Sequence, residues 1–378
     1  MNHWNLPFQN QLTDWLSRRT ARTGVRRVIP LAAAVASEIG NVRNENQDRA
    51  IVAHGWDVDG KRFAVAAVAD GIGGMRDGGA CAALALGTFV AVLNQAARTG
   101  SFGSEDLLNR AVFAANEAVH SKFRNEGGST LVAVLVRPNY PVVWLSVGDS
   151  RVYVSSRNSL VQISVDDTIA GQLGKKEDAE IEQSKLLQFI GMGSDLEPHI
   201  EKIYGGPESS VILTTDGVHY LDKSPGWLGR IVFNSPDPGV CVKRLVELAS
   251  WCGGPDNATV AVMPMNSSWD IDVKPSYDCL DVWDSFGELQ LIFESASLGT
   301  LIKPRREVSR PPVVAYAAAP IAAAPRAGGG GTSSARKANT QKTTSKEKPV
   351  SVKKEKIQPK KVKSEVPQLL MEFPNKTN

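Results

Sequence analysis

The stretch RFAVAAVADGIGG, residues 62–74, decides the fold. Residues 62–69 are almost wholly apolar or small, as in a strand that is buried on both faces. The strand ends at Asp70, and Gly71 follows at once. A strand end holds a side chain rigidly, and a neighbouring glycine lets the backbone carbonyl approach a ligand closely. The stretch therefore predicts a buried strand that presents an acidic turn.

Similar acidic turns occur elsewhere in the chain. They are NQD at 46–48, GDSR at 148–151, TDG at 215–217 and PDNAT at 255–259. Each has an aspartate at the end of a β-rich run or in the turn beside one. Carboxylates brought together would repel one another unless cations lay between them, and Mg²⁺ and Mn²⁺ prefer oxygen ligands. The pattern predicts a site for several metal ions on a β scaffold.

A metal site of this kind suits phosphate-ester hydrolysis, because metal binding lowers the pKa of water from 15.7 towards about 7. Asp70 is the best candidate to bridge two ions, and the Gly71 carbonyl would add a second oxygen. Asp216 and Asp256 would complete the first ion. Asp48 suits an outer role, in which it holds metal-bound water.

Arg43 lies five residues before Asp48, and its planar guanidinium suits bidentate phosphate binding. A plain surface arginine is the alternative. Residues 55–62, GWDVDGKR, imitate a phosphate-binding P-loop, but Arg62 stands where Ser or Thr is needed and a strand follows instead of a helix. We therefore predict a hairpin turn there. The sequence has no Cys-x5-Arg loop, which argues against a cysteine-nucleophile phosphatase.

Over roughly residues 35–264 the chain resembles the metal-dependent protein phosphatases, the serine/threonine phosphatases of type 2C, in a bacterial-like form. The matching segments are GNVRNENQD (40–48), DGIGG (70–74), GST (128–130), GDSR (148–151), TTDG (214–217) and DNAT (256–259). Any one of these segments is a weak signal, since Asp-Gly pairs are ordinary turns. Their occurrence together, in family order, is a strong one.

The resemblance implies an α+β fold, a four-layer α-β-β-α sandwich with two stacked antiparallel sheets flanked by helices. The metal ions, Mg²⁺ or Mn²⁺, would lie at one end: two core ions and a weaker third that Asp149 helps to bind. A hairpin-turn aspartate is the alternative for Asp149. Residues 166–205 would form the variable flap beside the site.

Two departures from the family pattern affect the site. Gln47 stands where relatives often have Glu, and its amide can still bond a metal-bound water. After Gly74 many relatives have a His that protonates the leaving group, whereas this chain has Met75, Arg76 and Asp77. Arg76 could bind phosphate, or Asp77 could move protons through water. We expect modest turnover.

Composition narrows the protein class. The chain has 378 residues, of which 42% are hydrophobic and 22% charged. No apolar run approaches the ~20 residues of a membrane span, and the N-terminus lacks the order of a signal peptide. The cysteines are scattered and form no C-x-x-C pair, which favours reduced thiols. We expect a cytoplasmic protein.

The composition also predicts a division of the chain into five parts. These are an N-terminal extension with a short amphipathic helix (1–30), the phosphatase domain (31–266), an ordered C-terminal extension with an edge strand at 289–293 (267–303), a Pro/Ala/Gly-rich then Lys-rich disordered linker (304–365) and a terminal segment (366–378). The terminal segment is either a docking peptide or apolar by chance. Within the domain, residues 175–190 are predicted to form a helical insertion. Residues 336–363 carry a net charge of +9, from eleven Lys/Arg and two Glu, so the rest of the chain carries −6. A solvated tether is the favoured role for this tail, with nucleic-acid binding as the alternative.

The predicted function is hydrolysis of phosphoserine and phosphothreonine in proteins by metal-activated water. A Ser/Thr kinase would be the natural partner. The rival hypothesis is a catalytically weak, phosphatase-like module that binds phosphoproteins and acts through its tail. The missing histidine motivates this rival.

Overall fold

The computed structural model divides the chain into two compact units, Met1–Leu301 and Ile302–Asn378. The structure describes only residues of the first unit. They are 7–75, 77–124, 126–157, 159–172, 185–206, 208–220, 226–266 and 278–293. The predicted linker at 304–365 and the docking peptide at 366–378 lie outside the described residues, as does Arg76.

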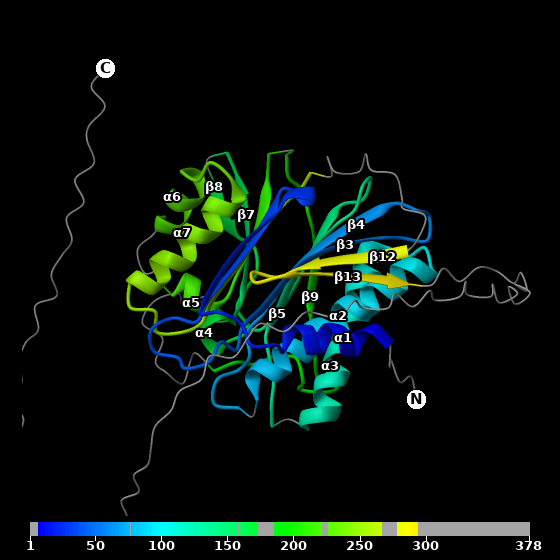
Figure 1. Cartoon of the computed structure of the whole chain (residues 1–378), viewed down its shortest axis with the longest axis horizontal. Coiled ribbons are helices and arrows are strands. Elements are labelled where there is room, and N and C mark those ends of the chain that lie inside the picture. The colour runs from blue at the N-terminus through cyan, green and yellow to red at the C-terminus, as the bar shows by residue number, and fades with distance from the viewer. Residues whose placement is uncertain are drawn as a thin grey trace, which may run out of the picture. The chain divides into compact units, whose positions relative to one another are not determined.

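The described strands form two antiparallel sheets (Figure 1). The first sheet has the order β1 (Thr23–Val28), β2 (Ala33–Glu38), β11 (Ala258–Pro264), β10 (Ser210–Thr214), β7 (Arg151–Ser156), β8 (Ser159–Gln162). The second has the order β13 (Glu288–Phe293), β12 (Asp278–Trp283), β3 (Arg49–Trp56), β4 (Arg62–Ala69), β5 (Leu131–Val136), β6 (Val142–Val147), β9 (His199–Ile203).

Helices cover the outer face of each sheet (Figure 1). Beside the second sheet lie α1 (Pro7–Leu16), α2 (Gly78–Thr99) and α3 (Ser104–Phe123). Beside the first lie α5 (Asp216–His219), α6 (Trp227–Phe233) and α7 (Pro238–Trp251). The short helices α4 (Ile169–Gln172) and η1 (Ile29–Leu31) lie in connections. The predicted four-layer α-β-β-α sandwich is confirmed.

Strand β4 shows how the sequence builds these layers. All its residues are buried, and alternate side chains point to opposite faces. Phe63, Val65 and Ala67 pack into the core beneath α2 and α3. Ala64, Ala66 and Val68 pack into the core between the sheets. Such burial on both faces explains why the strand appears in the sequence as one apolar run.

The N-terminal helix is docked on the domain. Phe8, Leu12 and Leu16 of α1 are buried, and the Gln9 side chain donates a 2.8 Å hydrogen bond to Thr88 of α2. The two helices cross closely, because a Cβ placed on Gly87 would come within 3.2 Å of the Thr13 backbone. Strand β1 follows and pairs with β2, so the folded sheet takes in residues that precede the predicted domain start at 31.

The C-terminal extension contributes β12 and β13. Strand β12 pairs with β3 between Asp281 and Trp283, and β13 lies at the edge, where residues 289–293 were expected to form a strand. The helical insertion predicted for 175–190 is absent from residues 185–190, while 173–184 lie outside the described residues. Leu186 and Ile190 form isolated β-bridges instead.

One helix in the described part, α2, has the length and composition to cross a membrane. However, 83% of its apolar window is buried inside the protein, as in the core helix of a globular domain.

Candidate metal centre

The antiparallel registers bring the acidic turns to one end of the sandwich. In the first sheet, Thr214 at the end of β10 lies opposite Arg151 and Val260, where β7 and β11 begin. Asp149 precedes Arg151 by two residues, Asp216 follows Thr214 by two, and Asp256 precedes Val260 by four, so all three lie at this end.

The Arg43 loop and the second sheet bring further groups to the same end. In the first sheet, Glu38 at the end of β2 lies opposite Ala258, so the Arg43 loop also begins there. In the second sheet, Ala69 lies opposite Arg49. Asp48, just before β3, and Asp70, just after β4, are therefore neighbours at the same end of the sheet.

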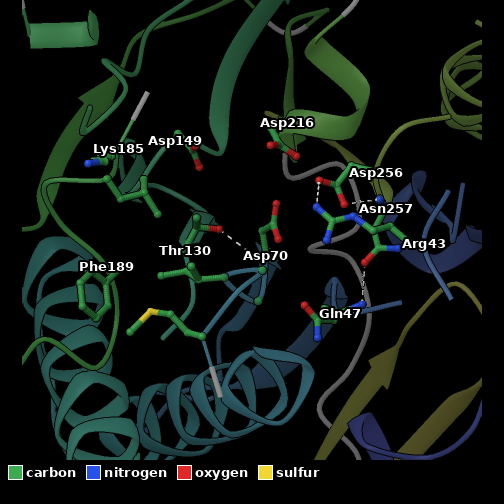
Figure 2. A pocket seen from close by; sticks show the side chains of 15 residues that line it. Arg43, Gln47, Asp70, Thr130, Asp149, Lys185, Phe189, Asp216, Asp256 and Asn257 are labelled. Atoms are coloured by element: carbon green, nitrogen blue, oxygen red, sulfur yellow. Dashed lines mark hydrogen bonds and ion pairs between the residues drawn. The ribbon is translucent and has the colours of Figure 1, made fainter. Parts of the chain in front are cut away.

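These side chains line one pocket of about 590 Å³ (Figure 2). The lining residues are Arg43, Gln47, Asp70, Gly71, Ile72, Gly73, Met75, Thr130, Asp149, Lys185, Leu186, Phe189, Asp216, Asp256 and Asn257. Six of the seven site residues proposed from the sequence are among them. The seventh, Asp48, is buried just behind the pocket and accepts a 2.9 Å hydrogen bond from the Thr215 hydroxyl.

The backbone around Asp70 is fixed, while its carboxylate faces the pocket (Figure 2). Its backbone N–H donates to the Thr130 hydroxyl at 2.9 Å. Its carbonyl accepts from the Thr130 N–H and the Ser129 hydroxyl, both at 2.8 Å. Gly71 is obligatory here, because an added Cβ would lie 2.3 Å from the Gly78 carbonyl at the start of α2.

Burial and mutual repulsion raise the pKa values of four aspartates at this end of the sandwich, Asp48, Asp70, Asp149 and Asp216. Burial, with the charge of Asp216, raises the pKa of Asp48 and of Asp149 to about 7. Burial and the charge of Asp256 raise that of Asp216 to about 6. Burial and the charge of Asp48 raise the pKa of Asp70 well above its ordinary value. Ionised together, these groups require a compensating positive charge.

The donor set fits hard divalent cations. Oδ1 of Asp48 and Oδ1 of Asp216 are buried and accept no hydrogen bond among the described residues, although the Thr259 hydroxyl lies near enough to Asp48 to lower its pKa. Carboxylate and backbone carbonyl oxygens are the ligands that Mg²⁺ and Mn²⁺ prefer. In the described ranges no three His, Cys, Asp or Glu side chains gather closely enough to hold an ion by themselves.

Arg43 lines the pocket and pairs with Asp256. Its Nη2 lies 2.6 Å from Asp256 Oδ2, and the two side chains are 43% and 29% exposed. Asn257 pins the Arg43 loop: its amide donates to the carbonyls of Ile39 and Glu45 and accepts from the Gln47 N–H. The guanidinium therefore stands beside the carboxylates, within reach of an anion in the pocket.

Comparison with known proteins agrees with this geometry. A family model described as protein phosphatase 2C matches residues 42–242, more than half of the chain. The chain belongs to the protein phosphatase 2C family.

Two bacterial proteins are similar in sequence to this family member. The serine/threonine protein phosphatase PstP of Mycobacterium tuberculosis is 29% identical over 248 residues, which are 63% of this chain and 45% of PstP. The protein phosphatase PhpP of Streptococcus pneumoniae is 25% identical over 244 residues, 62% of this chain and 97% of PhpP. The chain thus spans about half the length of the first of these relatives.

Solved structures of the family share the fold. The phosphatase MsPP of Mycobacterium smegmatis, in complex with cacodylate, is 31% identical with a TM-score of 0.52, covering 62% of this chain and 98% of its own. The catalytic domain of PstP, in complex with two manganese ions, is 27% identical with a TM-score of 0.50, covering 64% and 98%.

The turn after Gly74 contributes one described side chain to the pocket. Asp77 stands at the N-cap of α2 in a left-handed conformation, with φ of 52°, and does not line the pocket. Met75 does line it. Among the described residues of this turn, Met75 therefore presents its thioether to the pocket, and Asp77 does not line it.

The sequence did not single out several pocket residues, although three of them belong to the segment 166–205 that was expected to lie beside the site. Lys185, Leu186 and Phe189 reach the pocket only because Ile190 bridges to Ser129, a contact between segments far apart in the chain. The Arg43–Asp256 ion pair joins residues separated by 213 positions. Asn257 and Thr130 stand inside motifs that the sequence does mark, although their bonding partners depend on the fold.

Proposed function

We propose that this chain hydrolyses phosphoserine and phosphothreonine in proteins, with Mg²⁺ or Mn²⁺ as cofactor. The observation that carries the proposal is the set of mutually repelling, partly buried carboxyl groups that share one pocket with Arg43. Family membership supports the proposal, and so does the PstP catalytic domain, whose structure is a complex with two manganese ions.

Asp70, the Gly71 carbonyl, Asp216 and Asp256 are proposed to hold two core ions, and Asp149 a third. Bound divalent ions supply a nucleophile by lowering the pKa of water into the neutral range, and they stabilise charge on the phosphoryl group.

The chain's own groups bind and orient the substrate. Arg43 exchanges its contact with Asp256 for the phosphoryl oxygens, to which its planar N–H groups can donate in pairs. Asp48, held by the Thr215 hydroxyl, orients water at the rear of the pocket. With no histidine after Gly74, the leaving oxygen relies on solvent for its proton, so turnover is modest.

The deciding experiment is phosphate release from a phosphothreonine peptide with and without Mn²⁺. Wild type is expected to be active only with the metal, and Asp70→Ala to lose activity by at least a hundredfold, in the range of a lost electrostatic or metal contribution. Asp59→Ala is the matched control, because Asp59 is an exposed carboxylate in the turn at the far end of the β3–β4 hairpin. Equal rates for wild type and Asp70→Ala would rule out the enzyme proposal.

The same measurement addresses the rival adaptor function. A chain that binds the phosphopeptide without releasing phosphate would favour it. The proposal also includes phosphorylated proteins as substrates, a Ser/Thr kinase as the opposing enzyme and a cytoplasmic location. The family relationship supports the reaction class, which is phosphate hydrolysis from proteins.

A further inference from the structure

The pocket holds more than the carboxylates and Arg43. Four apolar side chains, Ile72, Met75, Leu186 and Phe189, line it as well, and we refer to these four as the apolar wall. Each is neither fully buried nor fully exposed. A pocket of about 590 Å³ exceeds what a phosphoryl group and its ions require, so part of it is left for another portion of the substrate.

The apolar wall is hydrogen-bonded to the backbone segment that holds the Asp70–Gly71 turn. Ser129 and Ile190 exchange two backbone hydrogen bonds, of 3.1 and 2.8 Å, and Ser129 also bridges to Gly71. Phe189 packs over Gly128, where an added Cβ would lie 2.4 Å from the Phe189 ring. The position of Phe189 is therefore set by the same segment that fixes Asp70.

The other end of the wall is anchored independently. Leu186 bridges to Thr168, and the Leu187 N–H donates to the Asp167 carbonyl at 2.7 Å. The buried Asp167 carboxylate in turn accepts from the Gly148 N–H at 2.9 Å, next to Asp149. A segment tied to Ser129 and to Asp167 presents its apolar side chains in a defined place.

Phe189 of the apolar wall lies across Asp70 from the proposed phosphate anchor, Arg43 (Figure 2). A phosphoryl group held between Arg43 and the carboxylates would leave the adjoining part of a peptide against the wall. Partly exposed apolar surface in such a pocket is removed from water only when it contacts apolar groups of a ligand, and that contact is favourable.

We propose, on the basis of the phosphatase function proposed above, that the apolar wall is a specificity subsite. It takes an apolar side chain that flanks the phosphorylated residue of a peptide substrate. The subsite is continuous with the phosphate pocket, so occupation of both parts requires one ligand with an apolar group beside a phosphate.

The test uses the full chain with Mn²⁺ and pairs of phosphothreonine peptides that differ only in Leu or Ser at one flanking position. Wild type is expected to prefer Leu on one side of the phosphothreonine by on the order of tenfold in kcat/KM. Phe189→Ala is expected to reduce this preference to twofold or less. Because the preference is a ratio within one variant, a general loss of activity cancels.

Leu187→Ala is the matched control, because Leu187 adjoins Leu186 but is 46% exposed and does not line the pocket. It should keep the wild-type preference. If Phe189→Ala fails to fold, Phe189→Leu serves instead, with a smaller loss of preference. Equal rates for both peptides with wild type, or an equal loss in Leu187→Ala, would overturn the subsite.

A small aromatic phosphate ester separates this inference from the function on which it rests. Hydrolysis of the ester without any peptide preference rejects the subsite and keeps the phosphatase proposal. If neither ester nor peptides are hydrolysed, the phosphatase proposal fails, and equilibrium binding of the two peptides then decides the subsite. Equal affinities would reject it.

Discussion

Ionisation of the buried Asp48 carboxyl group destabilises the folded chain. Its side chain is buried, and burial with the charge of Asp216 raises its pKa to about 7. A carboxyl group whose pKa is higher in the folded than in the unfolded chain stabilises the fold when protonated. That contribution is present below the unfolded value, near 4, and is lost as the pH rises towards 7.

We therefore expect the thermal stability of the metal-free protein to fall between about pH 4 and pH 7 through this group, and less so in Asp48→Asn, whose amide cannot ionise. Melting curves in chelator across this range measure the effect. The quantity to compare is the difference in melting temperature between wild type and Asp48→Asn at each pH. Burial lowers the pKa of His219, so this residue destabilises the fold in acid in both proteins, and its effect cancels in the difference. Parallel pH profiles for wild type and Asp48→Asn would contradict the expectation.

Arg43 carries a second prediction at this scale. Arg43→Ala should lower kcat/KM by about ten- to a hundredfold, because charge-assisted hydrogen bonds contribute roughly 1.5–3 kcal/mol. Arg43→Lys should recover only part of the loss, since it keeps the charge without the planar fork. Steady-state kinetics on a phosphothreonine peptide measure both. Arg157→Ala, which removes an exposed arginine paired with Glu208, is the control and should have no effect.

The acidic residues were predictable because each stands in a short turn at a strand end, and the order of the turns identifies the family. The contacts that these acidic residues make with distant parts of the chain could not be predicted. Phe189 enters the pocket through the Ser129–Ile190 bridge, and Arg43 meets Asp256 across 213 residues. Such contacts depend on sheet register, which a single sequence does not display.

At the scale of elements, the hairpin of β12 and β13 braces the rear of the site. Arg18 donates to Asp284 at 2.9 Å, and the N–H groups of Phe286 and Gly287 donate to the same carboxylate. Arg49 donates to the carbonyls of Leu16 and Asp48. The N-terminal segment, the hairpin and the Asp48 strand are thereby joined.

Asp284→Ala should lower the free energy of unfolding by about 1–3 kcal/mol, because a buried acceptor of several hydrogen bonds is lost. Denaturant unfolding measures the change. Glu288→Ala, which removes an exposed partner 3.7 Å from Arg26 in the same hairpin, should change it by less than about 0.5 kcal/mol. Similar losses in both variants would mean that the Asp284 bonds contribute nothing specific.

Element prediction succeeded where burial was two-sided and missed several edge and near-edge strands, although the edge strand β13 was expected. Strand β4 was predicted with its observed bounds because both faces are buried. Strands β1, β9 and β12 were missed, since their sequences, TGVRRV, HIEKI and DCLDVW, mix charged and apolar residues. Edge and near-edge strands are only partly buried, so their sequences show weak periodicity.

At the scale of the whole molecule, charge is divided unevenly along the chain. Residues 336–363 carry +9, and the remainder carries −6. A dense run of lysines attracts any polyanion at low ionic strength through counterion release, whether or not it has a specific partner. Binding to DNA at low salt would therefore not by itself distinguish a solvated tether from a nucleic-acid-binding segment.

Salt dependence makes the distinction. For the favoured tether, retention of the full chain on DNA should disappear by about 0.15 M salt, because screening weakens exposed charges. Removing residues 332–378 should abolish the low-salt retention and leave hydrolysis of a small phosphate ester unchanged, since all the pocket residues lie between Arg43 and Asn257. Retention that survives 0.3 M salt and requires the tail would favour a nucleic-acid partner. A fall in the small-ester rate on truncation would instead show that the tail acts on the catalytic centre.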